Sequence, residues 1–168
     1  MEKLIYFLVF CQAFGATVGA FSAVWSELAY LRAARDGKID VAEERHLHII
    51  ARGLRFGMTL LLLSSLGLVI VAYIAHSAPQ PALTPTYWTS VILALFIIGI
   101  TWTLSKRRIS FELGSAALFA GWWFLAYLTL GQVPNASFGS SLAVFVVATG
   151  VFYGILQYIR MLSTSRAR

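Results

Sequence analysis

Five long apolar stretches run through this sequence, and they limit what the chain can fold into more than any other feature. They cover about residues 4–31, 49–75, 86–105, 111–131 and 138–162, and none contains an internal proline. A helix needs about 20 mostly apolar residues to cross the hydrocarbon core of a bilayer. We therefore predict an all-α integral membrane bundle of five transmembrane helices, forming a single transmembrane domain over residues 1–168.

The composition supports a lipid environment. Of the residues, 59% are hydrophobic and 12% are charged, whereas about a quarter of an ordinary soluble domain is charged. The net charge of +6 could suggest nucleic acid. The charges flank apolar stretches instead of forming a patch, so we expect no nucleic-acid partner and assign them to lipid headgroups.

The basic residues predict the orientation of the bundle. If the helices alternate in direction, twelve of the thirteen Lys and Arg residues fall on one side, and Lys3 remains alone on the other. The twelve are Arg32, Arg35, Lys38, Arg45, Arg52, Arg55, Lys106, Arg107, Arg108, Arg160, Arg166 and Arg168. Because basic loops stay in the cytoplasm, we expect the N-terminus outside and the C-terminus cytoplasmic, in a multi-pass protein of the bacterial inner membrane.

Small residues at helical spacing indicate close helix packing. Pairs of glycines four residues apart occur in the first, second and fifth stretches, and they are Gly15/Gly19, Gly53/Gly57 and Gly150/Gly154. Small-xxx-small patterns let helix backbones approach each other in lipid. We expect these three helices to form a tight centre. The alternative is that the small residues leave room for a solute beside Gln12 and Gln157.

Charged residues near the predicted cytoplasmic ends of the helices form a second candidate site. Glu27 and Glu112 lie about one turn inside their stretches, and Arg52 and Arg55 open the second stretch. Carboxylates are unfavourable at this depth unless they are paired. We expect an ion-pair network of these four residues that fixes helix rotation. The alternative is a gate or a proton site.

The tandem Trp122-Trp123 lies near the middle of the fourth stretch, followed by Tyr127. Tryptophan in membrane proteins is usually enriched at the interface. A central pair could line a pocket for an apolar ligand, or it could simply pack. We carry Trp122, Trp123, Tyr127 and Gln12 forward as candidate ligand-binding residues.

No catalytic motif is present, and no stretch has a central histidine that could hold a haem. Cys11 is the only cysteine. We therefore predict no catalytic residue, no metal site and no cofactor, and we lean against an enzyme. The sequence favours an accessory or structural subunit of a membrane complex, or a module that binds a small apolar ligand. The alternative is a small-solute or ion transporter or channel that works as a homo-oligomer.

Overall fold

The computed structural model describes residues 2–36, 41–76, 80–106, 108–131 and 137–165; of residues 33–36, 41–48 and 163–165 it describes only the backbone. Throughout these ranges the regular structure is helical. The elements are α1 (Glu2–Asp36), α2 (Val41–Ile74), the short 3₁₀ helix η1 (Pro81–Leu83), α3 (Pro85–Ser105), α4 (Phe111–Thr129) and α5 (Phe138–Ser165).

Each of the five α-helices is long and apolar enough to cross a membrane. The apolar spans within them are Glu2–Arg32, Ile49–Ile74, Pro85–Ser105, Phe111–Thr129 and Phe138–Leu162. They agree with the stretches expected from the sequence to within a few residues at each end. Within the described residues, the prediction of an all-helical fold with five helices long and apolar enough to cross a membrane is confirmed.

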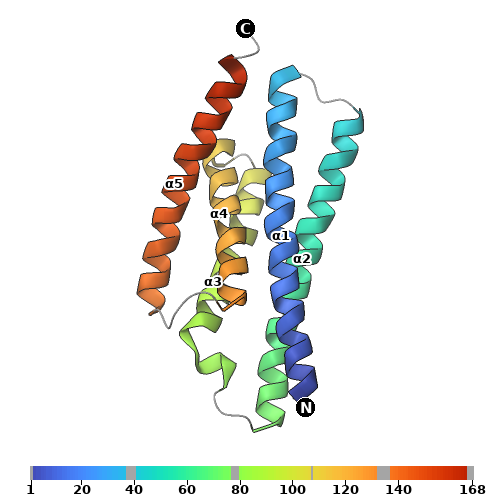
Figure 1. The fold of residues 1–168 in the computed structure, drawn as a ribbon, viewed down its shortest axis with the longest axis vertical. Coiled ribbons are helices and arrows are strands. Elements are labelled where there is room, and N and C mark those ends of the chain that lie inside the picture. Colours follow the sequence, from blue (N-terminus) through green and yellow to red (C-terminus); the bar gives the residue numbers. More distant parts are fainter. Residues whose placement is uncertain (1, 37–40, 77–79, 107, 132–136, 166–168) are drawn as a thin grey trace.

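The helices are arranged around α4 (Figure 1). The two longest, α1 and α2, form an antiparallel hairpin, and α4 packs against α1, α3 and α5. More than half of the apolar span of α4 is buried, 56%, against 11% for α5. The fourth helix is therefore the centre of the bundle, and α5 covers it from one side.

The two ends of the bundle differ in charge. The termini lie at opposite ends (Figure 1), as an odd number of antiparallel helices requires. We call the end at which α1 and α5 finish the basic end. The basic residues there with described side chains are Arg32, Arg52, Arg55, Lys106, Arg108 and Arg160. The side chains of Arg35, Lys38, Arg45, Arg107, Arg166 and Arg168, which we also expected on this side, lie outside the described residues.

Local sequence explains how α3 begins. Pro85 occupies its first position, where the missing N–H is harmless, and the Thr84 hydroxyl accepts a hydrogen bond from the backbone N–H of Tyr87 at 3.3 Å. The Trp88 indole N–H donates to the Ala82 carbonyl in η1 at 2.8 Å. These contacts tie the start of α3 to the connection that follows α2.

The α1–α2 hairpin is closest at two glycines. A β-carbon added to Gly15 would lie 2.8 Å from the Gly57 carbonyl oxygen, and one added to Gly57 would lie 2.6 Å from the Gly15 carbonyl oxygen. Side chains at these positions would collide with backbone, which cannot move locally. The two helices therefore cross here with their backbones in direct contact.

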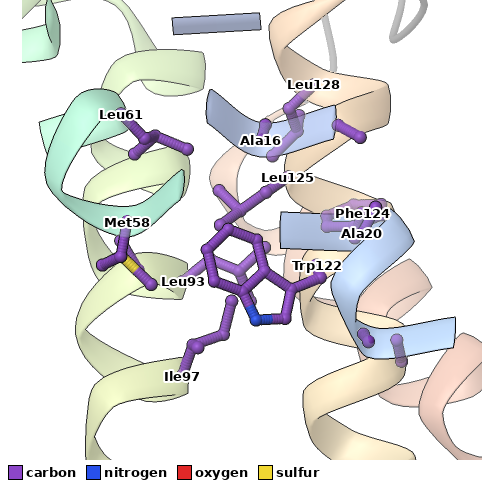
Figure 2. Packing of buried hydrophobic residues seen from close by; sticks show 14 of the residues in the cluster. Ala16, Ala20, Met58, Leu61, Leu93, Ile97, Trp122, Phe124, Leu125 and Leu128 are labelled. Carbon is purple, nitrogen blue, oxygen red and sulfur yellow. The ribbon is translucent and has the colours of Figure 1, made fainter. Parts of the chain in front are cut away.

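One residue of α4 fills the space between this hairpin and α3. Figure 2 shows the Trp122 ring among Met58 of α2, Ile97 of α3 and Ala20 of α1. Trp122 is 2% exposed. It joins four helices in one apolar core, which explains why a tryptophan stands at the centre of a span.

The glycine pair of α5 does not face the other helices, as we had expected it to do. Gly150 and Gly154 are exposed, and a β-carbon at either would meet nothing within 4 Å. The face of α5 that packs on the bundle instead carries Phe145, Leu156 and Arg160, all of them buried. The expected tight centre of the first, second and fifth helices is therefore wrong for α5. The helix docks through larger side chains on the opposite face, and α4 occupies the central position.

Candidate functional site

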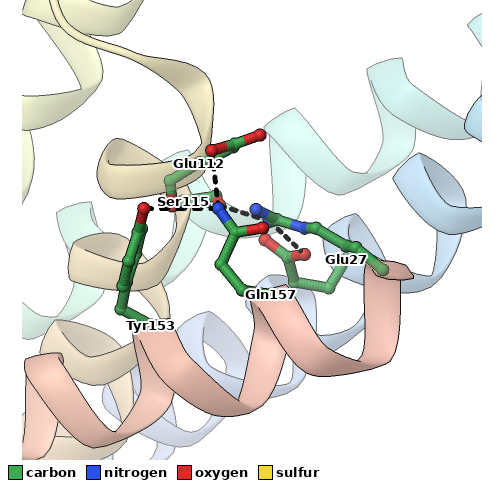
Figure 3. Close-up of polar contacts among 6 residues, drawn as sticks. Glu27, Glu112, Ser115, Tyr153 and Gln157 are labelled. Atoms are coloured by element: carbon green, nitrogen blue, oxygen red, sulfur yellow. Dashed lines mark hydrogen bonds and ion pairs between the residues drawn. The ribbon is translucent and has the colours of Figure 1, made fainter. Parts of the chain in front are cut away.

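A buried ion pair joins two helices that are distant in sequence. Arg160 of α5 donates from Nη2 to Oε2 of Glu27 on α1 at 2.8 Å. The same nitrogen is 2.7 Å from the Ser115 hydroxyl oxygen on α4, which accepts a second hydrogen bond. Glu27 is 7% exposed and Arg160 is 8% exposed. Figure 3 shows Glu27 and Ser115 on two different helices, and dashed lines mark their contacts with the Arg160 guanidinium group.

Two aromatic rings cover this guanidinium group. Its central carbon lies 5.0 Å from the centre of the Tyr30 ring and 5.8 Å from that of Phe111. The two rings are themselves 4.4 Å apart. A cation near aromatic rings is attracted by their quadrupoles, most strongly when water is excluded. Charge pairing and ring contacts therefore combine to hold α1, α4 and α5 together at the basic end.

A second polar cluster lies beside the ion pair but is more exposed. The Gln157 side-chain amide of α5 donates to a carboxylate oxygen of Glu112 on α4, and it is 3.3 Å from the Tyr153 hydroxyl (Figure 3). This contact adds a second link between α4 and α5. On the sequence alone, a solute could lie beside Gln157. In the structure this side chain instead bonds to groups of the protein.

The expected four-residue network differs from the observed one. Glu27 pairs with Arg160 rather than with Arg52 or Arg55, and Glu112 binds Gln157. Arg52 and Arg55 are exposed on α2. From the sequence, Arg160 was counted only among the basic residues expected on the cytoplasmic side. Its burial and its pairing with Glu27 were therefore not predicted. A signal was present: Ser141, Phe145, Leu156 and Arg160 share one face of α5 at helical spacing, which places the arginine in line with the packed side.

A cavity of about 590 Å³ lies between the first four helices toward the basic end. Its walls are mostly apolar, with Glu27 and Ser115 at one side and Arg55 on α2. The lining residues are Ala23, Ser26, Glu27, Ala51, Leu54, Arg55, Met58, Thr59, Ile97, Ile98, Thr101, Trp102, Leu104, Ser105, Phe111, Ser115, Leu118, Phe119 and Trp122. The volume lies within the range of about 300–1,000 Å³ that is typical of small-molecule sites.

The cavity opens between α2 and α3. Thr59 on α2 and Ile98 and Trp102 on α3 line it and are nevertheless exposed. These two helices follow each other in sequence, yet they make little direct contact, and η1 links their ends away from the basic end. Their basic-end halves therefore form the two sides of an opening that leads to the polar groups of the cavity.

The candidate ligand-binding residues are divided between the cavity and other surfaces. Trp122 forms part of the cavity wall. Trp123 is 37% exposed and packs against Phe21, with ring centres 6.0 Å apart, while Tyr127 is 50% exposed. Gln12 donates to the Ser65 hydroxyl at 2.9 Å, within the α1–α2 contact. Of the four, Trp122 alone belongs to the cavity lining.

No family model, no curated protein and no solved structure matches this chain. The described site combines a neutralised buried ion pair with an apolar cavity that has a few polar groups at one side. Such a cavity can bind and orient a molecule that is mostly apolar.

Proposed function

We propose that this chain is a membrane protein that binds a small, mostly apolar ligand in the cavity between α1, α2, α3 and α4. One observation carries the proposal: a cavity of about 590 Å³ has Trp122 and Ile97 in its wall and reaches polar side chains at the basic end. The ion pair of Glu27 and Arg160 supports it, because it holds α1, α4 and α5 in place while α2 and α3 stay apart. The protein acts alone or as the binding module of a larger membrane complex.

The proposal includes an orientation in the membrane. Basic residues near helix ends favour the cytoplasmic side, and Arg52, Lys106 and Arg108 belong to the basic end. We infer that this end is cytoplasmic, that the N-terminus is outside, and that the host membrane is a bacterial inner membrane. The opening between α2 and α3 then leads to the cytoplasmic leaflet.

Photolabelling in reconstituted vesicles tests the binding site. The probe is an uncharged long-chain alcohol carrying a photoreactive diazirine, and labelled peptides are identified by mass spectrometry. We expect saturable labelling of the cavity wall at Met58, Ile97 and Leu118, which excess unlabelled alcohol prevents. The variant Thr59→Phe with Thr101→Phe fills the opening and should remove this labelling.

A matched variant controls for general effects of added phenylalanine. Leu63→Phe with Leu95→Phe changes exposed positions on the same two helices, outside the lining, and it should leave the labelling intact. Labelling spread evenly over all exposed apolar residues, with no saturation and no effect of the blocking variant, would refute the ligand-binding proposal.

A second candidate role is that of a subunit. The outward face of α5 exposes Gly150 and Gly154, over which another helix could approach closely. Native mass spectrometry of the protein extracted in lipid nanodiscs tests this role. A mass above that of one chain, lost in Gly154→Leu but not in Gly99→Leu, would support it. A single-chain mass for the unmodified protein would argue against it.

A further inference from the structure

Arg55 is a charged residue of the cavity lining for which the described residues provide no counterion. It lines the cavity, it is exposed, and within the described part of the chain it has no ion-pair partner. At 1.5 Å per residue it lies about 9 Å along α2 from Ile49, where the apolar span begins. An arginine at this depth is unfavourable unless it reaches water or meets an anion.

The other charges of the cavity cancel. Glu27 lines the wall, but its carboxylate is bound to the guanidinium group of Arg160. Ser115 also lines the wall and is bound to the same arginine. Together these groups carry no net charge, so Arg55 gives the cavity a net charge of +1. A ligand that complements this site has one negative group close to α2.

The remainder of the cavity lining is mostly apolar and extends along the helices. On α3 its wall runs from Ile97 to Ser105, which is about 12 Å along the helix axis at 1.5 Å per residue. On α2, Arg55 lies about 4.5 Å nearer the basic end than Met58 at 1.5 Å per residue. Ile97 and Trp122 are the lining residues of α3 and α4 farthest from that end. The charged group and the apolar wall are therefore arranged along one axis, as the headgroup and chain of an amphiphile are.

Resting on the proposed ligand-binding function, we infer that the ligand is an anionic amphiphile. Its carboxylate or phosphate headgroup binds Arg55, and one alkyl chain lies along Met58, Ile97 and Trp122. An arginine can bind either oxyanion through paired N–H donors. The negative charge also favours approach to the basic end. There Lys106 follows the lining residue Ser105, and the Arg108 guanidinium carbon lies 5.5 Å from the ring centre of the lining residue Trp102.

Competition against the photolabelling probe tests the inference. The competitors are a fatty acid, the alcohol of the same chain length, and phosphatidylglycerol, each at increasing concentration in vesicles of phosphatidylcholine. We expect the fatty acid or the phospholipid to compete about tenfold better than the alcohol, as a hydrogen bond to a charged group implies. The anion that competes more strongly shows whether the headgroup at Arg55 comes from a free fatty acid or from a membrane phospholipid.

Variants of Arg55 identify the headgroup contact. Arg55→Gln should remove the preference for the anion while the alcohol still competes, and Arg55→Lys should keep part of it. Arg52→Gln is the matched control, because Arg52 is exposed on the same helix but lies outside the lining.

The outcomes separate this inference from the proposed function. An anion that competes no better than the alcohol, or a preference that survives Arg55→Gln, would overturn the inference and leave the apolar binding site standing. Absence of saturable labelling by the alcohol itself would overturn the proposed function.

Discussion

The indole ring of Trp122 on α4 lies where a side chain of residue 19 on α1 would be. A β-carbon built on Gly19 would be 2.0 Å from two carbons of this ring, far inside any allowed contact. The ring is buried and cannot swing into solvent. The size of residue 19 therefore controls how closely α1 and α4 approach and where the wall of the cavity lies.

Replacing this glycine should destabilise the bundle. Gly19→Leu must displace Trp122 or separate α1 from α4, and overpacking of this kind costs about 1–3 kcal/mol, occasionally more. Thermal unfolding in detergent, followed by circular dichroism, measures the loss. Gly150→Leu is the control, because a β-carbon there meets nothing within 4 Å. Equal stability of the two variants would contradict the observed packing.

Breaking the buried ion pair should weaken the fold strongly. In Glu27→Gln the guanidinium group of Arg160 stays buried beside the rings of Tyr30 and Phe111 without its counterion. Removing one partner of a buried pair typically costs about 3–5 kcal/mol. We expect a clear drop in the unfolding temperature, while the variant still inserts in the membrane because its spans are unchanged.

Two further variants test whether charge is the cause. Glu27→Gln combined with Arg160→Met removes both charges and should recover part of the lost stability, because no buried charge then lacks a partner. Glu112→Gln alters the more exposed contact with Gln157 and should cost less than about 1 kcal/mol. If the double variant were less stable than Glu27→Gln alone, the assignment of the loss to an unpaired arginine would be wrong.

The two adjacent tryptophans should differ in their contribution to stability. Trp122→Ala removes a ring that is 2% exposed and lies in the core that α4 shares with α1, α2 and α3, so we expect a loss of about 3–5 kcal/mol. Trp123 is 37% exposed and packs on Phe21 and Phe119 at one side. Trp123→Ala should lose much less. Chemical unfolding of both variants in the same detergent provides the comparison, and equal losses would refute the difference in burial.

The sequence predicted the helices well because their signal is local. Each span is a continuous apolar stretch, and prolines mark the connection before α3, where Pro81 begins η1 and Pro85 begins α3. Length and hydropathy are therefore enough to locate the five helices to within a few residues.

The partners and the cavity could not be predicted in the same way. The pairing of Glu27 with Arg160 joins residues 133 positions apart, and it depends on α5 docking beside α1. The cavity depends on α2 and α3 diverging at one end, which no residue pattern within either helix encodes. The glycine pairs show the same limit: Gly15 meets Gly57, whereas the identical spacing at Gly150 and Gly154 faces outward. Spacing identifies a smooth face, but tertiary packing decides which face is used.

The proposed orientation can be tested with single cysteines. Lys38→Cys falls in the segment between α1 and α2, and Ala82→Cys falls in η1, between α2 and α3. Each is introduced after Cys11, the only natural cysteine, is replaced by alanine. Because α2 is long and apolar enough to cross the bilayer once, the two sites should lie on opposite sides of the membrane.

In intact bacterial cells, a membrane-impermeant maleimide should label Ala82→Cys at once and Lys38→Cys only after the cells are opened, since the basic segment is expected in the cytoplasm. The reverse pattern would invert the orientation and place the cavity toward the outer leaflet. Labelling of both sites from the same side would mean that α2 does not cross the membrane.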